Sequence, residues 1–228
     1  MSTGTSIPPA IGVTELYVYG ASGHGKVVAE IALASGHQVH GFIDDSPSAI
    51  GRCLLGLPVL GGSEWLAQRA RQCKVAVALG VGDNHARHRI AEQCRQLGVP
   101  LMTLIHPSAI VSSSAAIGNG TVLMARVVVN ADATIGDGVI LNSGAIVEHD
   151  CCVGNHAHLS PNSAMGGASS IGMLSWLGMG AAIIHGVCVG ANSVVGAGAV
   201  VIHDLPDNIV AVGVPARISR RAAHAQES

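Results

Sequence analysis

The chain has 228 residues, of which 49% are hydrophobic and only 11% are charged, and this balance excludes a disordered protein. A formal net charge of -2 gives no electrostatic footprint for nucleic acid or for an anionic membrane surface. Aromatic residues make up only 2% of the chain while glycine occurs 30 times, so the core must consist of aliphatic side chains and backbone. That composition favours a flat, repetitive architecture.

Neither a membrane span nor a secretion signal is expected. No run approaches the roughly 18 uninterrupted apolar residues of a transmembrane helix. Residues 1–12 lack the basic and apolar regions of a signal peptide. The 6 cysteines form no CxxC pair and do not have the spacing of a secreted disulfide domain. We therefore expect a cytoplasmic protein.

Residues 14–103 follow a short N-terminal tail, 1–13, and alternate predicted strands and helices. We expect strands at 16–19, 38–43 and 75–79, and helices at 27–34, 64–72 and 86–97. This alternation predicts a small, Rossmann-like parallel α/β sheet. Ligands of such sheets bind at the carboxyl ends of the strands.

Two polar motifs fall at those strand ends. The loop Gly20–Lys26 fits the pattern GxxxxGK, but Val27 stands where a P-loop needs Ser or Thr for magnesium, and the full dinucleotide spacing is missing. A glycine-rich turn that opens a helix still offers free N–H groups to a phosphate. The loop therefore has two interpretations: it binds a nucleotide diphosphate, or it is a tight turn with no ligand. The pair Asp44-Asp45 is either a partner for a ribose or base, or a solvated turn.

A repeat of six residues fills the second half of the chain. From Ile105 to Val201 every sixth residue is aliphatic, and the residue four positions after each of the first sixteen is Ala, Ser, Thr, Val or Cys. The residue directly after the aliphatic one is often Gly or Asn, which we expect to adopt positive φ at sharp corners. Three hexapeptides make one triangular coil, so residues 104–218 are predicted to form a parallel β-helix.

The repeat also sorts the histidines by position on the coil, because residues 18 apart stack on one edge. One edge carries His149, Gly167, His185 and His203. Only the pair His156 and His158 combines close spacing with nearby carboxylates, so we expect no metal site.

One corner of the repeat departs from the small and polar residues found elsewhere. Glu148-His149-Asp150 places an imidazole between two carboxylates. Such an imidazole can take a proton from an attacking amine or hydroxyl, and an adjacent carboxylate raises its basicity. The alternative is a surface histidine with charged neighbours and no catalytic role.

Motifs in a specific order along residues 16–217 resemble the PglD/NeuD group of bacterial sugar acyltransferases. They are Gly20–Lys26, Asp44-Asp45, Gly80–Asn84 with Arg87, Asn142–Cys151, Val153-Gly154, His158–Pro161, Val195–Val201, Asp204–Asp207 and Gly213–Ala216. The resemblance implies a left-handed β-helix, acetyl-CoA as co-substrate, and a homotrimer with active sites between neighbouring β-helices. His203, where many members have Lys, and the bulky Leu174–Trp176 corner depart from the pattern.

The resemblance also implies roles for individual residues. It makes His149 the general base and Asp150 the residue that tunes it. The implied acetyl-CoA contacts are His158, Gly167, Met179 and Ala197. The implied contacts of a nucleotide-linked sugar are Ser22, Gly23, His24, Gly25, Lys26, Asp44, Asp45, Gly82, Asn84 and Arg87.

The function expected from the sequence is N-acetylation, by direct transfer from acetyl-CoA, of a nucleotide-linked 4-amino-4,6-dideoxy sugar. The alternative within the same fold is O-acetylation of a sialic acid or related sugar. A non-catalytic β-helix scaffold belongs to a different class and would bind no acetyl-CoA, and an NAD-dependent enzyme would leave the β-helix unexplained. The base (uracil, guanine or thymine), the sugar stereochemistry and the downstream glycan stay open. Residues 219–228 are expected to be a polar tail, as a frayed helix.

Overall fold

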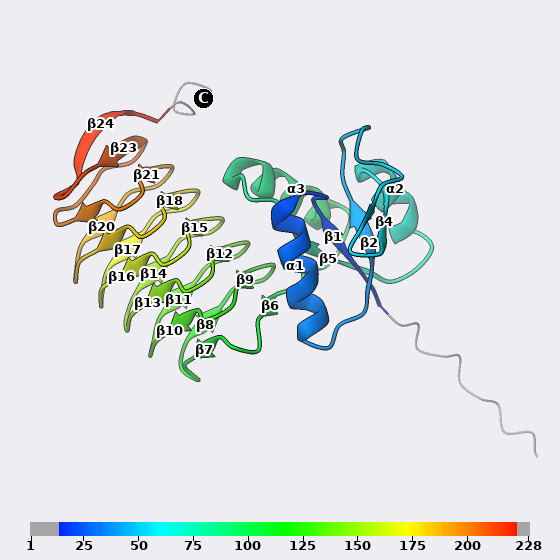
Figure 1. Cartoon of the computed structure of the whole chain (residues 1–228), viewed down its shortest axis with the longest axis horizontal. Coiled ribbons are helices and arrows are strands. Elements are labelled where there is room, and N and C mark those ends of the chain that lie inside the picture. Colours follow the sequence, from blue (N-terminus) through cyan, green and yellow to red (C-terminus); the bar gives the residue numbers. More distant parts are fainter. Residues whose placement is uncertain (1–13, 223–228) are drawn as a thin grey trace, which may run out of the picture.

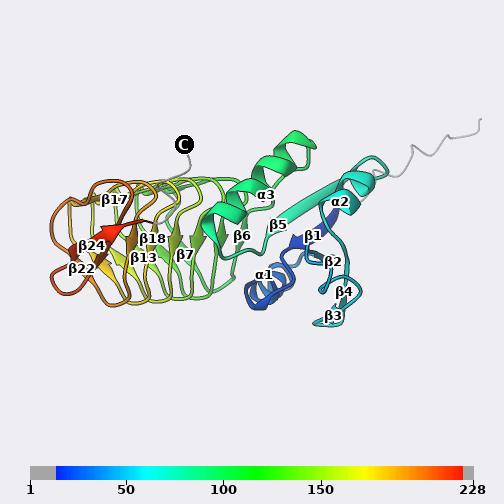
Figure 2. The same ribbon diagram turned by 90° about the horizontal axis from the view of Figure 1, so that it is seen from above.

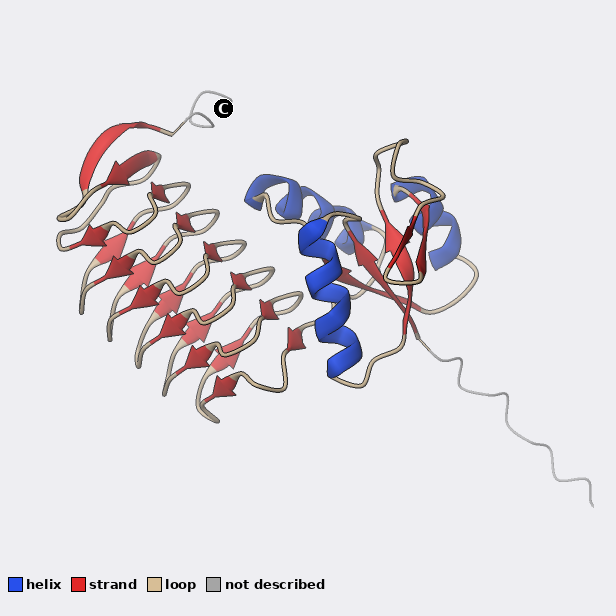
Figure 3. Ribbon diagram, in the orientation of Figure 1, coloured by secondary structure: helices blue, strands red, loops and turns tan. Residues whose placement is uncertain are grey.

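The computed structural model describes residues 14–222, so the tail expected at 1–13 and the end of the tail expected at 219–228 lie outside the described residues. Figure 1 shows an α/β domain followed by a β-helix, and Figure 3 shows that the helices belong to the first domain. Within residues 14–222, no helix is long and apolar enough to cross a membrane.

The first domain is a five-stranded sheet with helices on both sides. Its elements are β1 (Glu15–Tyr19), α1 (Gly23–Ala34), β2 (Val39–Ile43), β3 (Cys53–Leu54), β4 (Leu57–Gly61), α2 (Ser63–Ala70), β5 (Val75–Leu79) and α3 (Asn84–Gln96). The strand order is β3-β4-β2-β1-β5, with all pairs parallel except the β3–β4 hairpin, which the sequence did not predict. α1 packs on one face of the sheet with Val18 and Phe42, while α2 and α3 pack on the other with Tyr19 and Leu79.

Residues 104–201 form a left-handed parallel β-helix of two-residue strands, as the repeat and the resemblance predict. Its strands are β6 (Leu104–Ile105), β7 (Ile110–Val111), β8 (Ala116–Ile117), β9 (Val122–Leu123), β10 (Val128–Val129), β11 (Thr134–Ile135), β12 (Ile140–Leu141), β13 (Ile146–Val147), β14 (Cys152–Val153), β15 (His158–Leu159), β16 (Ala164–Met165), β17 (Ser170–Ile171), β18 (Trp176–Leu177), β19 (Ala182–Ile183), β20 (Cys188–Val189), β21 (Val194–Val195) and β22 (Val200–Val201). Figure 2 shows the coils stacked into a prism with the first domain beside its first coils.

The prism has three faces, each a parallel sheet. Face I contains β6, β9, β12, β15, β18 and β21 and is extended by β23 (Ile209–Val212) and β24 (Arg217–Arg221). Face II contains β7, β10, β13, β16, β19 and β22, and face III contains β8, β11, β14, β17 and β20. Each strand from β6 to β19 pairs with the strand 18 residues further along the chain, so side chains of one phase form columns, as expected.

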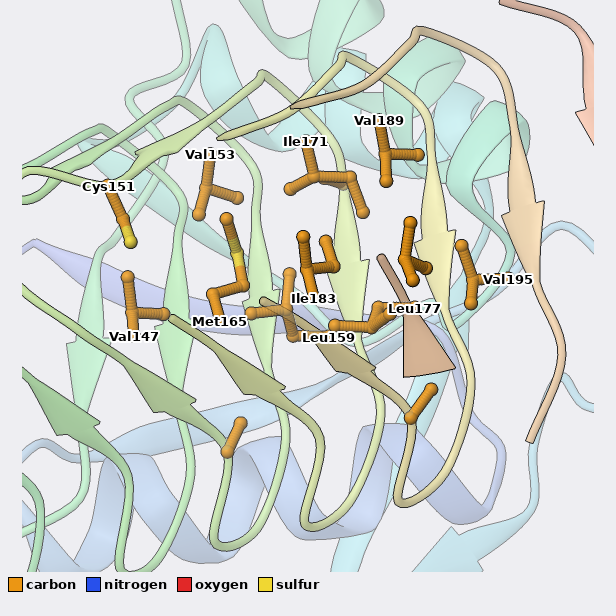
Figure 4. Close-up of a cluster of buried hydrophobic side chains, with 14 of the residues drawn as sticks. Val147, Cys151, Val153, Leu159, Met165, Ile171, Leu177, Ile183, Val189 and Val195 are labelled. Carbon is orange, nitrogen blue, oxygen red and sulfur yellow. The ribbon is translucent and has the colours of Figure 1, made fainter. Parts of the chain in front are cut away.

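The interior of the prism is a column of aliphatic side chains. Val147, Val153, Leu159, Met165 and Ile171 point inward at successive rungs (Figure 4) and are at most 3% exposed. Burial of this kind contributes about 25 cal/mol for each Å² of apolar surface removed from water. The first rung is an exception, because no earlier coil covers Ile105, which is 38% exposed.

The glycines directly after the aliphatic residues are not required by positive φ, which is the reason expected from the sequence. From residue 120 to residue 198 the left-handed residue of each corner is the third after the aliphatic one, as at Asp150 (φ 58°) and Asn162 (φ 56°), and not the one directly after it. A Cβ at Gly154, directly after Val153, would instead lie 2.4 Å from the backbone nitrogen of Met173 on the next coil. Glycine is needed there because neighbouring coils approach closely.

The end of the described chain is a strand where a frayed helix was expected. β24 pairs antiparallel with β23, and the Ala222 N–H donates to the Asn208 carbonyl. The physical reason is that β23 would otherwise present unpaired backbone groups at the edge of face I.

Candidate active site

His149 and Asp150 form a hydrogen-bonded pair at the corner between faces II and III. The His149 Nδ1 and the Asp150 Oδ2 are 2.7 Å apart, and 55% of the His149 side chain is exposed to solvent. The hydrogen bond to Asp150 is the main cause that raises the pKa of His149 above its ordinary value, with Glu148 adding to it. A neutral imidazole that donates from Nδ1 has its Nε2 lone pair available to accept a proton.

The backbone of the following coil lies directly beside that Nε2. A Cβ on Gly167 would be 2.5 Å from His149 Nε2, so only glycine leaves room for the ring in this position. Gly167, which we predicted as a coenzyme contact, therefore lies with the candidate base.

The glycine-rich loop opens α1 earlier than the sequence predicted, at Gly23 instead of Val27. Gly25 is buried, and a Cβ there would lie 1.8 Å from the Gly20 carbonyl oxygen. The first N–H groups of a helix have no partner within it, so the exposed start at Ser22 and Gly23 is suited to an anion, and binding there stays a prediction. Lys26 is exposed in the same turn.

The acidic pair is engaged within its own domain. Asp44 accepts hydrogen bonds from the Ala21 and Ser46 N–H groups, at 2.7 and 2.9 Å. Asp45 accepts from the Tyr19 hydroxyl at 2.6 Å and from the Ser63 N–H at 2.7 Å. These bonds hold the glycine loop and the start of α2 in place.

Two residues predicted to bind the sugar nucleotide join the two domains. Arg87 has no exposed surface and donates to the carbonyls of Gly138 and His156, at 2.7 and 2.6 Å. Asn84 is also buried and donates to the carbonyls of Leu174 and Ser175, at 3.0 and 3.1 Å. These donors are taken up by the corner between faces III and I, and the contact of Arg87 and Asn84 with the sugar nucleotide stays a prediction. Burial lowers the pKa of Arg87 to about 9, which leaves it charged at pH 7.

His158 lies where the glycine loop meets face I. It is 6% exposed, and its ring stacks on Trp176 with the centroids 5.3 Å apart and the planes at 8°. The His24 ring lies on its other side, with 6.4 Å between centroids. Burial lowers the pKa of His158 to about 3 and that of His24 to about 4, so both imidazoles are neutral at pH 7. Nothing in the motif pattern predicted that Trp176 would stack on His158.

Met179 and Ala197, both predicted as coenzyme contacts, line one groove at the corner between faces I and II. The groove has a volume of about 280 Å³, and Trp176 and Ser160 form its other end. Trp176 is held there because its indole N–H donates to the Ser160 hydroxyl at 2.6 Å. Gly82, from the loop after β5, is partly exposed, and β5 pairs with β1, the strand that leads into the glycine loop.

The predicted site residues thus form two groups within one chain. The glycine loop, His158 and the groove lie along face I and its corner with face II. His149, Asp150 and Gly167 lie at the corner between faces II and III, which is opposite face I in a three-sided prism. Within residues 14–222, no three His, Cys, Asp or Glu side chains are placed to hold a metal ion.

Known proteins with this arrangement are sugar acetyltransferases. Residues 15–94 match the family described as the PglD N-terminal domain. The structure also matches PerB from Caulobacter crescentus, solved in complex with CoA and GDP-perosamine, with a TM-score of 0.85 and 42% sequence identity over 90% of this chain and 97% of that chain. The chain belongs to the PglD family of nucleotide-sugar N-acetyltransferases.

Two further relatives of this PglD-family protein agree. The acetyltransferase domain of PglB from Neisseria gonorrhoeae FA1090 matches with a TM-score of 0.83 and 39% identity, over 90% of this chain and all (100%) of that one. A UDP-N-acetylbacillosamine N-acetyltransferase from Bacillus subtilis (strain 168) is 39% identical over 117 residues, which are 47% of this chain and 50% of that protein. The match therefore spans half the length of this curated relative. The resemblance and the fold class predicted from the sequence are confirmed.

Proposed function

We propose that the protein transfers the acetyl group of acetyl-CoA directly to the amine of a nucleotide-linked 4-amino-4,6-dideoxy sugar, with His149 as the general base. The observation that carries the proposal is the His149–Asp150 pair, whose free Nε2 is exposed beside the backbone of Gly167. PerB, which shares 42% identity, was solved with CoA and GDP-perosamine, and a structure of the PglB domain contains acetyl coenzyme A. Acetyl-CoA is accordingly the acyl donor.

The transfer needs one base and one oxyanion donor. His149 Nε2 accepts a proton from the sugar amine as its nitrogen attacks the thioester carbonyl carbon. The negative charge that develops on the carbonyl oxygen is met by a backbone N–H of a glycine-rich corner. When the C–S bond breaks, the CoA thiolate leaves and takes the proton back from the imidazolium. Asp150 stabilises that imidazolium throughout.

A second copy of the chain completes the site in this proposal. The outward column of face II is apolar from end to end: Ile110, Val128, Ile146, Ala164, Ala182 and Val200. The corresponding column of face III includes Thr134 and Ser170. Packing face II against neighbours in a closed trimer would bring the His149 corner of one copy to the groove of the next.

The glycine loop holds the nucleotide in this account, because the exposed start of α1 offers unpaired N–H groups to a diphosphate. The matched relatives are named as N-acetyltransferases, which favours an amine over a hydroxyl as the acceptor. Solved structures of the Caulobacter enzyme include variants in which one histidine is replaced, in complex with CoA and GDP-perosamine. The reaction is expected to take place in the cytoplasm.

The test is a substrate panel. CoA release should be measured with UDP-, GDP- and TDP-linked 4-amino-4,6-dideoxyhexoses, each beside its 4-hydroxy counterpart. We expect turnover with at least one amino sugar and none with the hydroxy compounds. Acetylation of free sialic acid, without any heat of UDP, GDP or TDP binding in calorimetry, would replace this proposal with the O-acetyltransferase alternative.

A further inference from the structure

The outer surface of face I changes character along the prism. Its first strands are covered by the α/β domain, since Val122 and Ile140 share a buried cluster with α1. Beyond His158 the covering ends, and Trp176 is 41% exposed. The groove of about 280 Å³ begins at this point and continues past Val194 to Ala197.

A second hollow joins the first. It has a volume of about 200 Å³, shares Trp176 and Val194 with the groove, and adds Val210 and Arg220. Asp83, at its far wall, is engaged as the N-cap of α3 by accepting from the Ala86 N–H. The two hollows together follow face I from Ser160 and Trp176 to its last strand.

That last strand, β24, is basic. Its sequence is Arg-Ile-Ser-Arg-Arg, all five residues are exposed, and the whole chain has only 12 Lys and Arg residues. Arg220 pairs with Val210 and Arg217 pairs with Val212. Directly paired residues of neighbouring strands project from the same side of the sheet. Arg217 and Arg220 therefore share the side of face I on which the hollows lie.

Arg217 stands beside the end of the groove. A Cβ on Gly196, which lines the groove, would lie 2.8 Å from a methyl carbon of Val212, the residue paired with Arg217. Arg221 pairs with Ile209, which is buried in the interior, so Arg221 projects from the other side of β24. Arg217 and Arg220 therefore project from the side of β24 on which the hollows lie, and Arg221 does not.

We propose that Arg217 and Arg220 bind the 3′-phosphate of coenzyme A, and this inference rests on the proposed function. CoA carries its thioester at one end of a narrow pantetheine arm and its phosphates at the other. With the thioester at the predicted coenzyme contact His158 on β15, β24 is four strand spacings away, about 19 Å at ~4.8 Å per spacing. The pantetheine arm and the nucleotide beyond it, when extended, can span this distance from the thioester to the 3′-phosphate. Guanidinium groups match phosphate oxygens in charge and in bidentate geometry.

The test compares acetyl-CoA with acetyl-3′-dephospho-CoA, which lacks only the phosphate in question. We expect the wild-type KM to be about tenfold higher for the dephospho compound, since a charge-assisted hydrogen bond contributes a free energy of that order. In Arg217→Gln/Arg220→Gln, the KM for acetyl-CoA should rise about tenfold to the same value, with kcat unchanged. The matched control, Arg221→Gln, removes the same charge from the other side of β24 and should keep the discrimination.

A direct binding measurement separates this inference from the proposed function. The chain has 2 tryptophans, so Trp65→Phe leaves Trp176 as the only fluorophore of its kind, beside the groove. Titration with CoA and with 3′-dephospho-CoA reports affinity without any acetyl transfer. The inference is supported if the Trp65→Phe protein binds 3′-dephospho-CoA more weakly than CoA, and if the same protein with Arg217→Gln/Arg220→Gln binds the two with equal affinity. This holds even if no sugar is acetylated. Discrimination that survives the double substitution overturns it, whatever the activity.

Discussion

His149 and Gly167 occupy the same corner of consecutive coils, and a Cβ on Gly167 would lie 2.5 Å from His149 Nε2. The ring therefore rests against bare backbone, with its other nitrogen held by Asp150. This contact fixes the candidate base beside the backbone of the next coil.

Gly167→Ala tests that contact. The new methyl group meets the far end of an exposed side chain, so the His149 ring should rotate away and the fold should persist. We expect kcat/KM to fall about 100-fold, as for loss of a general base, with an unchanged melting temperature. In a His149→Ala background the same substitution should cost little more, because the ring it displaces is gone. Full additivity of the two losses would show that Gly167 acts independently of His149.

Asp150→Asn tests how the base is tuned. The hydrogen bond to Asp150 holds the pKa of His149 above its ordinary value, so removing the carboxylate charge should lower that pKa. Because the base acts unprotonated, the acidic limb of the kcat/KM profile should move to lower pH, and the weaker base should give a lower plateau. Glu148→Gln should shift the limb in the same direction by less. A limb that stays in place or moves to higher pH would exclude His149 as the titrating group.

Arg87→Met tests the connection between the domains. The substitution leaves the buried carbonyls of Gly138 and His156 without donors, which should cost about 3 kcal/mol of unfolding free energy. The melting temperature should fall by roughly 6–12 °C for a chain of this size. Arg89→Met, at an exposed position of the same helix, is the control and should change little. If Arg87 instead bound the nucleotide, the KM for the sugar nucleotide would rise while the melting temperature stayed constant.

Ile146→Glu tests whether face II is an interface between copies. Ile146 lies in the apolar outward column of that face. A buried carboxylate without a partner should dissociate the assembly, so light scattering should give a monomer mass and acetyl transfer should be lost. Cys152→Glu, on face III, should keep both the mass and the activity. A monomeric but fully active Ile146→Glu variant would exclude a shared site.

The hexapeptide pattern was sufficient to predict each strand of the β-helix because one side chain in six must fill a shared interior. Two kinds of feature escaped it. The glycine after Val153 is required by the approach of the next coil, which a local pattern does not contain. Arg87 and Asn84 follow a loop that resembles a ligand-binding motif, but their donors face a β-helix corner more than 50 residues away in sequence, and only the packing of the two domains shows this.

The short strands β3 and β24 were missed for a related reason. β3 has two residues and no alternation of apolar and polar side chains. β24 is exposed at all of its residues and polar at all but Ile218, so its place in face I comes from backbone pairing with β23 and not from side-chain burial.

The most direct test of the account mixes two inactive variants. His149→Ala removes the base, and Gly23→Glu places a carboxylate at the start of α1, where the side chain has open space but repels a phosphate. If one copy supplies His149 and its neighbour supplies the glycine loop, random co-assembly of equal amounts makes one site in four intact, so about a quarter of wild-type activity should return. Activity that stays at zero in the mixed assembly, with both variants folded and associated, would place His149 and the nucleotide site in the same copy and contradict the account.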